Sequence, residues 1–283
     1  MSHITSLFTF SDKANIPYYE FPSERKTNKV LLCIHGITSE LDQLFKMAEL
    51  LRSEVSIDIH IPVLRGYTSF ESGKGDLNEQ GRYDLDLQEM IDELSKEYEE
   101  IFLLGHSMGA GNLLRYSLEQ PSNHIVDIFL VSPFIHPSLD VFHDNNGDQK
   151  EGDYEIFFKR AAALSMLDRL NVHFFSYLPV VKIPLREIPY DETSTVKSYT
   201  LSFRLMMSRF IKDPSILNSA PLHFYRIFLG SQDEVISGLK FKKYWETEVG
   251  GDVYLASTHD HNSILTSSEL INDLIRSVNK SFV

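Results

Sequence analysis

Short apolar runs alternate with helix-type patterns along the first half of the chain. Runs that are continuously apolar, or that alternate apolar and polar residues, are typical of strands. These runs lie at 29–36, 56–66, 100–107 and 125–134. Apolar residues spaced three and four positions apart predict amphipathic helices. The segments with this spacing are 41–54, 84–98 and 108–120. Strands that alternate with helices predict a mostly parallel sheet with helices on both faces.

The alternation stops in the middle of the chain and returns near its end. Residues 138–221 hold helix-like pieces rich in aromatic residues, with too many apolar side chains for a linker. A strand pattern returns within 222–236 and again at 252–256, and an amphipathic helix pattern covers 267–282. The middle segment is therefore interpreted as an insertion into an α/β domain.

The break in the alternation of strands and helices predicts that the chain has two structural parts. Residues 1–137 and 222–283 form the core domain, and 138–221 form a helical cap, or lid. The insertion leaves the core after a strand, at the edge of the sheet where ligands bind. Its large apolar side chains could line an apolar slot there or form the lid's own core. They are Phe157, Phe158, Phe174, Phe175, Tyr177, Met206, Met207 and Phe210.

Composition and charge narrow the class of protein. The net charge of −13 argues against a nucleic-acid partner and disfavours docking on anionic lipid. The first residues lack a signal-peptide pattern, and no apolar run approaches the roughly 20 residues that span a bilayer. We therefore expect a cytoplasmic protein without a stable membrane anchor. The single cysteine, Cys33, excludes an intrachain disulfide and is expected to be a core thiol.

The sequence "GHSMG" places Ser107 between Gly105 and Gly109, after a predicted strand and before a predicted helix. This context indicates a nucleophile elbow, a strained turn that holds the serine oxygen clear of the sheet. The glycines let the neighbouring backbone pass without Cβ clashes. The N–H of Met108 then lies at a helix N-terminus, where it can stabilise an oxyanion.

A serine nucleophile needs a base, and the base needs an acid to orient it. In this architecture the chain order is serine, acid, histidine. Asp233 lies in the loop that follows the strand pattern within 222–236 and is the expected acid, with Glu234 as its neighbour and rival. Two histidines follow the last strand. We favour His261 over His259 as the base, because the loop must reach back across the edge of the sheet.

The second oxyanion donor is expected after the first central strand. There, "CIHGITSE" supplies Gly36, which allows the backbone to turn, and then the N–H of Ile37. His35 is expected to be structural. The sequence "HDH" at 259–261 lacks the further ligands that a metal site needs. We expect neither a metal nor another cofactor.

Together, "GHSMG", "IHGITS", "PVLRGY", "GSQDEVI" and the late histidine resemble the α/β-hydrolase family. The resemblance spans nearly the whole chain outside the insertion. Within the family the chain is most similar to monoacylglycerol lipases, lysophospholipases and related carboxylesterases, which also insert a helical cap at this place. The resemblance implies Ser107 as nucleophile, Asp233 as acid and His261 as base. It also implies Ile37 and Met108 as oxyanion donors.

These features predict a serine hydrolase that cleaves small-molecule carboxylic esters with an apolar, lipid-like acyl part. The alternatives are a peptidase, a thioesterase or a catalytically silent binding protein on the same fold. An aminopeptidase would need lid carboxylates to hold the substrate amine. Glu187, Asp191 and Glu192 are the residues available for that role. The sequence does not determine the acyl chain length or the oligomeric state.

Overall fold

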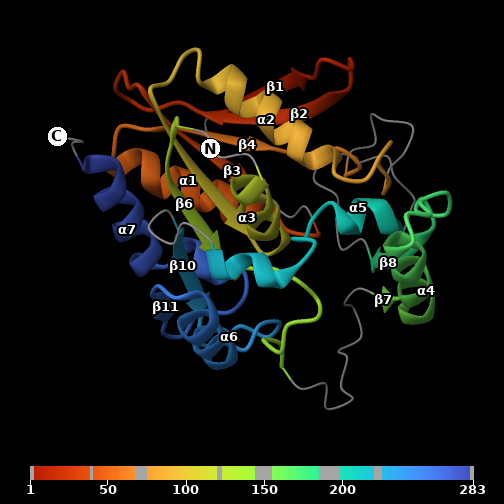
Figure 1. Cartoon of the computed structure of the whole chain (residues 1–283). Coiled ribbons are helices and arrows are strands. Elements are labelled where there is room, and N and C mark those ends of the chain that lie inside the picture. The colour runs from red at the N-terminus through yellow and green to blue at the C-terminus, as the bar shows by residue number, and fades with distance from the viewer. Residues whose placement is uncertain are drawn as a thin grey trace.

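The computed structural model describes residues 3–38, 41–67, 75–119, 123–143, 155–184, 198–219 and 225–280. Its centre is an eight-stranded sheet with the strand order β1-β2-β4-β3-β5-β6-β10-β11 (Figure 1). Strand β2 runs antiparallel to both its neighbours, and the other pairs are parallel. The strands are β1 (Ile4–Thr9), β2 (Asn15–Phe21), β3 (Lys29–Ile34), β4 (Asp58–Pro62), β5 (Glu100–His106), β6 (Ile125–Val131), β10 (Tyr225–Gly230) and β11 (Val253–Ala256).

Helices cover both faces of this sheet, which confirms the predicted α/β architecture (Figure 1). They are α1 (Asp42–Glu54), α2 (Arg82–Leu94), α3 (Met108–Glu119), α6 (Gly238–Tyr244) and α7 (Ser268–Asn279). A π-helical segment, η3 (Trp245–Val249), continues α6, and the 3₁₀ turn η4 (Ser263–Thr266) precedes α7. Helix α1 packs against α7, and α2 packs against α3. The central strands are almost fully buried, as expected for a sheet covered on both faces.

The core contains Cys33 as a free, fully buried thiol, as the sequence predicts. Burial raises the pKa of this thiol, so it remains protonated. None of the helices in the described part of the chain is both long and apolar enough to traverse a bilayer.

The N-terminal hairpin of β1 and β2 was not predicted. Strand β1 lies at the edge of the sheet and is mostly exposed, so it carries little apolar pattern. Ion pairs fasten the hairpin to the core: Arg65 bonds both Asp12, beyond β1, and the buried Asp86 of α2. Contacts between residues so far apart in sequence leave no local signature.

The inserted segment is only partly helical, so the expectation of a helical lid is incomplete. Besides α4 (Phe158–Arg169), α5 (Phe203–Met207) and the 3₁₀ turn η1 (Pro214–Ser219), it forms a three-stranded antiparallel sheet. Its strands are β7 (Glu155–Ile156), β8 (Pro179–Pro184) and β9 (Ser198–Ser202). These strands are short and pair with one another, so the alternation of strand and helix that identifies the core is missing.

The second half of the insertion packs on the core near the start of α3. The Asn112 side chain of α3 donates to the carbonyl oxygen of Ser208 at 3.0 Å, and the N–H of Ser202 donates to the carbonyl oxygen of Gly75 at 2.7 Å. Helix α3 begins where β5 ends, so this part of the insertion lies at the carboxyl edge of the sheet.

Candidate active site

Ser107 occupies the sharp turn between β5 and α3, with a left-handed φ of 53°. Such a conformation is strained for a residue with a Cβ atom and must be held by its surroundings. The Ser107 N–H donates to the carbonyl oxygen of Val131 at 2.9 Å, and its own carbonyl oxygen accepts from the N–H of Phe134 at 3.1 Å. The backbone at the end of β6 therefore fixes the turn.

The two glycines of the elbow lie where no Cβ atom fits. A Cβ atom on Gly105 would come within 2.6 Å of the backbone of Ala110. One on Gly109 would lie 2.1 Å from the carbonyl oxygen of Ile34, at the end of β3. Helix α3 thus packs so tightly on the strand ends that only glycine is tolerated, which is the role expected from the sequence.

His261 and Asp233 form a buried hydrogen-bonded pair. The Nδ1 atom of His261 lies 3.0 Å from Asp233 Oδ1 and 2.9 Å from Oδ2. Asp233 Oδ1 also accepts the N–H groups of Val235 and Ile236 at 2.9 and 2.8 Å. Burial alone would raise the pKa of Asp233, but the bonds from His261 and Ile236 outweigh it and lower that pKa. The carboxylate is ionised, so Nδ1 carries the proton and Nε2 is free to accept one.

Of the two candidate histidines, the structure brings His261, and not His259, to Asp233. His259 is partly exposed, and its carbonyl oxygen accepts the N–H of Gln232 at 2.9 Å. The rival acid Glu234 bonds the backbone of His261 and not its ring: the Oε2 atom of Glu234 accepts the N–H of His261 at 3.1 Å. Glu234 therefore holds the backbone of the residue whose ring Asp233 orients.

His106, which the sequence analysis did not single out, joins this pair to the elbow. Its Nε2 donates to the carbonyl oxygen of His261 at 2.8 Å, and the two rings lie 5.0 Å apart. His106 directly precedes Ser107, so this bond brings the His261 loop beside the serine. Burial and the neighbouring His261 lower the pKa of His106 to about 3, which keeps it neutral.

Two buried neutral histidines predict a loss of stability in acid. The pKa values of His35 and His106 are lowered from 6.5 to about 3 in the folded chain. The unfolded chain therefore binds these protons first. Their contribution to the free energy of unfolding is fully present above about pH 6.5. As the pH falls toward 3, the free energy of unfolding decreases by up to about 1.4 kcal/mol per pH unit for each histidine.

Urea unfolding between pH 7.5 and pH 5 measures this slope. The variant His106→Gln keeps a donor for the carbonyl oxygen of His261 but has no titrating ring. Its free energy of unfolding is expected to fall less steeply with decreasing pH than that of the wild type. Equal slopes in the two proteins would show that the pKa of His106 does not differ between the folded and unfolded states.

The loop after β3 lies against the elbow. A Cβ atom on Gly36 would lie 3.3 Å from Ser107 Cβ, so the backbone here passes directly beside the serine. His35 is structural, as expected: its Nδ1 donates to the carbonyl oxygen of Gly36 at 2.7 Å, and its Nε2 accepts the N–H of Leu64 at 3.0 Å. In a trans peptide the C=O and N–H point in opposite directions. Holding the Gly36 carbonyl therefore aims the Ile37 N–H away from the His35 ring.

Met108 is the first residue of α3, where a backbone N–H has no acceptor within the helix. It directly follows Ser107 in the elbow. The structure thus places Met108, and Gly36 directly before Ile37, next to the serine. Donors fixed in this way, before a substrate binds, are suited to stabilise an oxyanion.

The aromatic side chains near Ser107 are only partly those expected. Phe134, whose N–H bonds the Ser107 carbonyl, has its ring 4.9 Å from Phe142 and 5.4 Å from Phe210. Of the lid residues named from the sequence, Phe210 and Met206 are buried, but others are exposed, Phe158 to 63% and Phe174 to 77%. Phe175 and Tyr177 are exposed as well. The exposure of these four side chains does not fit the alternative in which they form the lid's own core.

Comparison with known proteins gives a family match. A family model described as "Serine aminopeptidase, S33" matches residues 25–237. No curated protein sequence matches the chain.

Solved structures with a similar fold cover nearly the whole chain. A soluble variant of monoglyceride lipase from Saccharomyces cerevisiae, in complex with a substrate analog, is 17% identical with a TM-score of 0.68, covering 99% of this chain and 96% of that one. Monoacylglycerol lipase from Paleococcus ferrophilus is 16% identical with a TM-score of 0.60, covering 93% and 96%. Carboxylesterase CesB from Bacillus subtilis is 12% identical with a TM-score of 0.59, covering 98% and 92%. At such identities the likeness concerns the fold.

Proposed function

The chain belongs to the serine aminopeptidase S33 family, and on that premise we propose that it cleaves carboxylic esters with an apolar acyl part through an acyl-enzyme on Ser107. The protein is a serine hydrolase with the α/β-hydrolase fold. The observation that carries the finer proposal is the buried pair of His261 and Asp233 beside the strained turn of Ser107.

The proposed reaction has two halves. Nε2 of His261 takes the proton of the Ser107 hydroxyl as its oxygen attacks the ester carbonyl carbon. The same proton then passes to the departing alcohol, which leaves an acyl group on Ser107. In the second half a water molecule gives its proton to Nε2 and attacks the acyl carbon, and Ser107 recovers its proton as the acid leaves. Asp233 keeps Nδ1 protonated and stabilises the imidazolium in both halves.

The tetrahedral intermediate of each half carries a negative oxygen. The N–H groups of Ile37 and Met108 are the donors that we propose for it. The proposal is supported by the loop at Gly36 and the first turn of α3, because both abut Ser107. Losing one such donor costs roughly 3 kcal/mol of transition-state stabilisation.

The proposed preference for an apolar acyl group is supported by the rings of Phe134, Phe142 and Phe210. They form one cluster that begins at a residue bonded to the Ser107 backbone. In this proposal the insertion, residues 138–221, acts as a lid that contributes Phe142 and Phe210 to the cluster. An acyl chain that leaves the elbow on this side would be in contact with aromatic surface and removed from water.

Catalytic efficiency is therefore expected to rise with acyl length until the cluster is covered. Each added methylene contributes up to about 0.8 kcal/mol, or roughly fourfold in kcat/KM. The measurement is kcat/KM for p-nitrophenyl acetate, butyrate, octanoate and decanoate. The variant Phe210→Ala is expected to flatten the rise, whereas Phe174→Ala, which truncates an exposed lid ring, leaves it unchanged.

A steady fall from acetate to decanoate, the same in all three proteins, would contradict the acyl preference. A small-ester esterase would then describe the protein better. The loss of the preference would leave the serine mechanism intact, because every ester in the series requires Ser107.

The family description favours one second candidate, an aminopeptidase. The lid carboxylates named for that role, Glu187, Asp191 and Glu192, lie outside the described residues. Adding aminoacyl p-nitroanilides to the ester series decides between the two. Faster turnover of an anilide with a free α-amine than of any ester would favour the aminopeptidase.

A further inference from the structure

Arg209 is a cation buried without a carboxylate partner in the described part of the chain. Its side chain lies just after α5 and is 0% exposed. The Nη2 atom donates to the carbonyl oxygen of His35 at 2.6 Å. Among the described residues, Nε and Nη1 have no acceptor in normal hydrogen-bond geometry, although the hydroxyl groups of Tyr67 and Tyr83 interact with the guanidinium. Removing a charge from water in this way is costly, since no carboxylate among the described residues offsets the loss of hydration.

Two aromatic rings flank the guanidinium but only partly replace its hydration. Its central carbon lies 5.4 Å from the ring centre of Tyr67 and 5.6 Å from that of Tyr83. Cation–π contacts at these distances are weaker than an ion pair with a carboxylate. An arrangement that costs stability is more common at functional sites than elsewhere.

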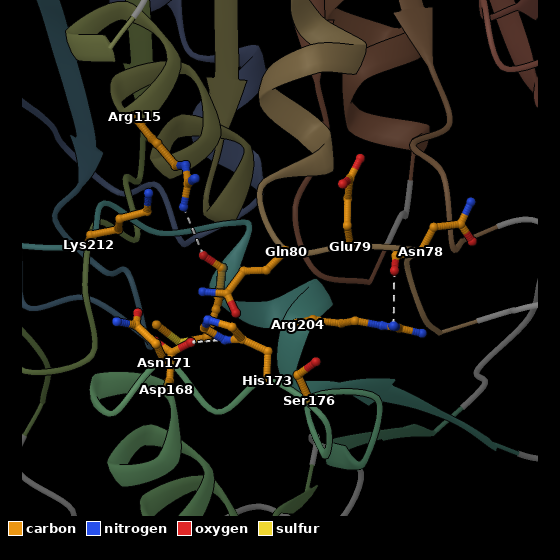
Figure 2. Close-up of a pocket in the computed structure, with 11 residues that line it drawn as sticks. Asn78, Glu79, Gln80, Arg115, Asp168, Asn171, His173, Ser176, Arg204 and Lys212 are labelled. Carbon is orange, nitrogen blue, oxygen red and sulfur yellow. Dashed lines mark hydrogen bonds and ion pairs between the residues drawn. The ribbon is translucent and has the colours of Figure 1, made fainter.

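The lid segment that carries Arg209 is fastened to the core from several sides. Figure 2, a close-up of a polar cavity of about 700 Å³ beside α5, shows Arg115 reaching from α3 toward the end of α5. Arg115 donates to the carbonyl oxygens of Met207 and Phe210, on both sides of Arg209. In the same view Arg204 donates to the carbonyl oxygen of Asn78.

Further bonds complete the attachment. Arg204 forms an ion pair with Asp76, and Ser208 bonds both the Asn112 side chain and the N–H of Gly81. The residues on either side of Arg209 are thus bonded to the core. The backbone that carries Arg209 is thus anchored by bonds other than the one to His35.

The carbonyl that Arg209 binds begins the oxyanion loop. The next residue, Gly36, lies against Ser107, and the one after it, Ile37, supplies a proposed oxyanion donor. A Cβ atom on Gly109, in the first turn of α3, would lie 2.7 Å from the same His35 carbonyl oxygen. The His35 carbonyl group therefore lies between the guanidinium and the two backbone segments that would face the oxyanion. These segments are the loop at Gly36 and the first turn of α3.

Arg209 also acts on the ring of His35. Burial, with the positive charge of Arg209 as the next cause, lowers the pKa of this histidine to about 3. The neutral ring can both accept the N–H of Leu64 and donate to the Gly36 carbonyl, and the second bond aims the Ile37 N–H. A protonated ring would lose the bond to Leu64.

We propose that Arg209 is a positioning residue of the oxyanion hole: a lid arginine that fixes the His35–Ile37 loop and places a positive charge behind it. This inference rests on the proposed function. The charge stabilises the negative oxygen of the tetrahedral intermediate more than the neutral ester, because opposite charges attract strongly where water is excluded. Arg209 thereby couples the placement of the lid to the rate of the chemical step.

The test uses the full chain with Arg209→Met, Arg209→Lys and the control Lys212→Met. Lysine keeps the charge, and methionine removes both the charge and the donor. The control removes an exposed positive charge three residues further along. The substrate is p-nitrophenyl butyrate, and the inhibitor is a long-chain alkyl trifluoromethyl ketone, which adds to a catalytic serine to form an oxyanion.

Arg209→Met is expected to lower kcat roughly 10- to 100-fold, less than the loss of a direct donor, with KM within about threefold of wild type. The inhibition constant of the ketone rises by the same factor as kcat falls. Arg209→Lys recovers part of both, and Lys212→Met changes neither. The thermal midpoint of Arg209→Met is not lowered, because an unpaired buried charge has been removed.

A folded Arg209→Met protein with wild-type kcat and wild-type ketone binding overturns the inference. So does a variant whose loss of activity follows a loss of stability, with KM and kcat changed alike. Where Arg209→Met does not fold, Arg209→Gln takes its place under the same criteria. Failure of the proposed function has a different signature: a fluorophosphonate then leaves Ser107 of the wild type unlabelled, and both proposals fall.

Discussion

Replacing Ser107 by alanine is expected to lower kcat for p-nitrophenyl butyrate by a factor of about 10⁶. The hydroxyl is the only group at the elbow that can form the acyl-enzyme, so the loss is nearly complete. Residual hydrolysis comes from direct attack of water on the ester, with the oxyanion donors stabilising the tetrahedral intermediate. The fold is expected to survive, because alanine keeps the Cβ atom and the backbone bonds to Val131 and Phe134 do not involve the hydroxyl.

The matched control is Ser117→Ala, in helix α3 but away from the elbow. The Ser117 hydroxyl bonds the carbonyl oxygen of Leu114 and the hydroxyl of Tyr225. The control variant therefore loses the same chemical group as Ser107→Ala, together with its hydrogen bonds. Wild-type turnover is expected there. Substantial turnover in a stably folded Ser107→Ala protein would rule out the serine mechanism.

The second large effect is expected at the base. His261→Gln lowers kcat/KM by about 10⁵-fold or more, because without Nε2 the serine hydroxyl keeps its proton at the moment of attack. Asp233→Asn costs about 10⁴-fold, since an amide at this position favours the wrong tautomer of His261.

His259→Gln is the control for the base, two residues earlier in the same loop. Its ring forms no bond to Asp233 among the described contacts, and its backbone carbonyl keeps the bond to Gln232. We expect a change of less than about tenfold in kcat/KM. If His259→Gln were the inactive variant and His261→Gln the active one, the assignment of the base would be wrong, although a triad would remain.

The candidate catalytic residues could be predicted from the sequence because each follows a strand of the parallel core. Ser107, Asp233 and His261 come after β5, β10 and β11, and the carboxyl ends of parallel strands share one edge of the sheet. The sequence favours His261 over His259 because the loop after the last strand must be long enough to reach back across the edge of the sheet. In the structure it is the Nδ1 atom of His261 that lies 2.9 Å from Asp233 Oδ2, which supports the proposal of His261 as the base.

The rest of the site depends on contacts between distant parts of the chain. Nothing near Arg209 in the sequence indicates a buried side chain that reaches the His35 carbonyl 174 residues earlier. The burial of the aromatic side chains of the lid could not be predicted from the sequence either. Phe174 and Phe210 are both aromatic, yet Phe174 is 77% exposed and Phe210 is buried against Phe134. His106 had a local signal, since it stands inside the elbow motif, but its bond to His261 spans 155 residues.

The central claim is that Ser107 acts as the nucleophile. Its most direct test is the mass of the intact protein after treatment with a fluorophosphonate, followed by mapping of the modified peptide. The account predicts one adduct per chain, located on Ser107, and none on Ser107→Ala or after prior incubation with the trifluoromethyl ketone. A wild-type protein that hydrolyses esters yet gains no adduct, or gains it on another residue, would contradict the account.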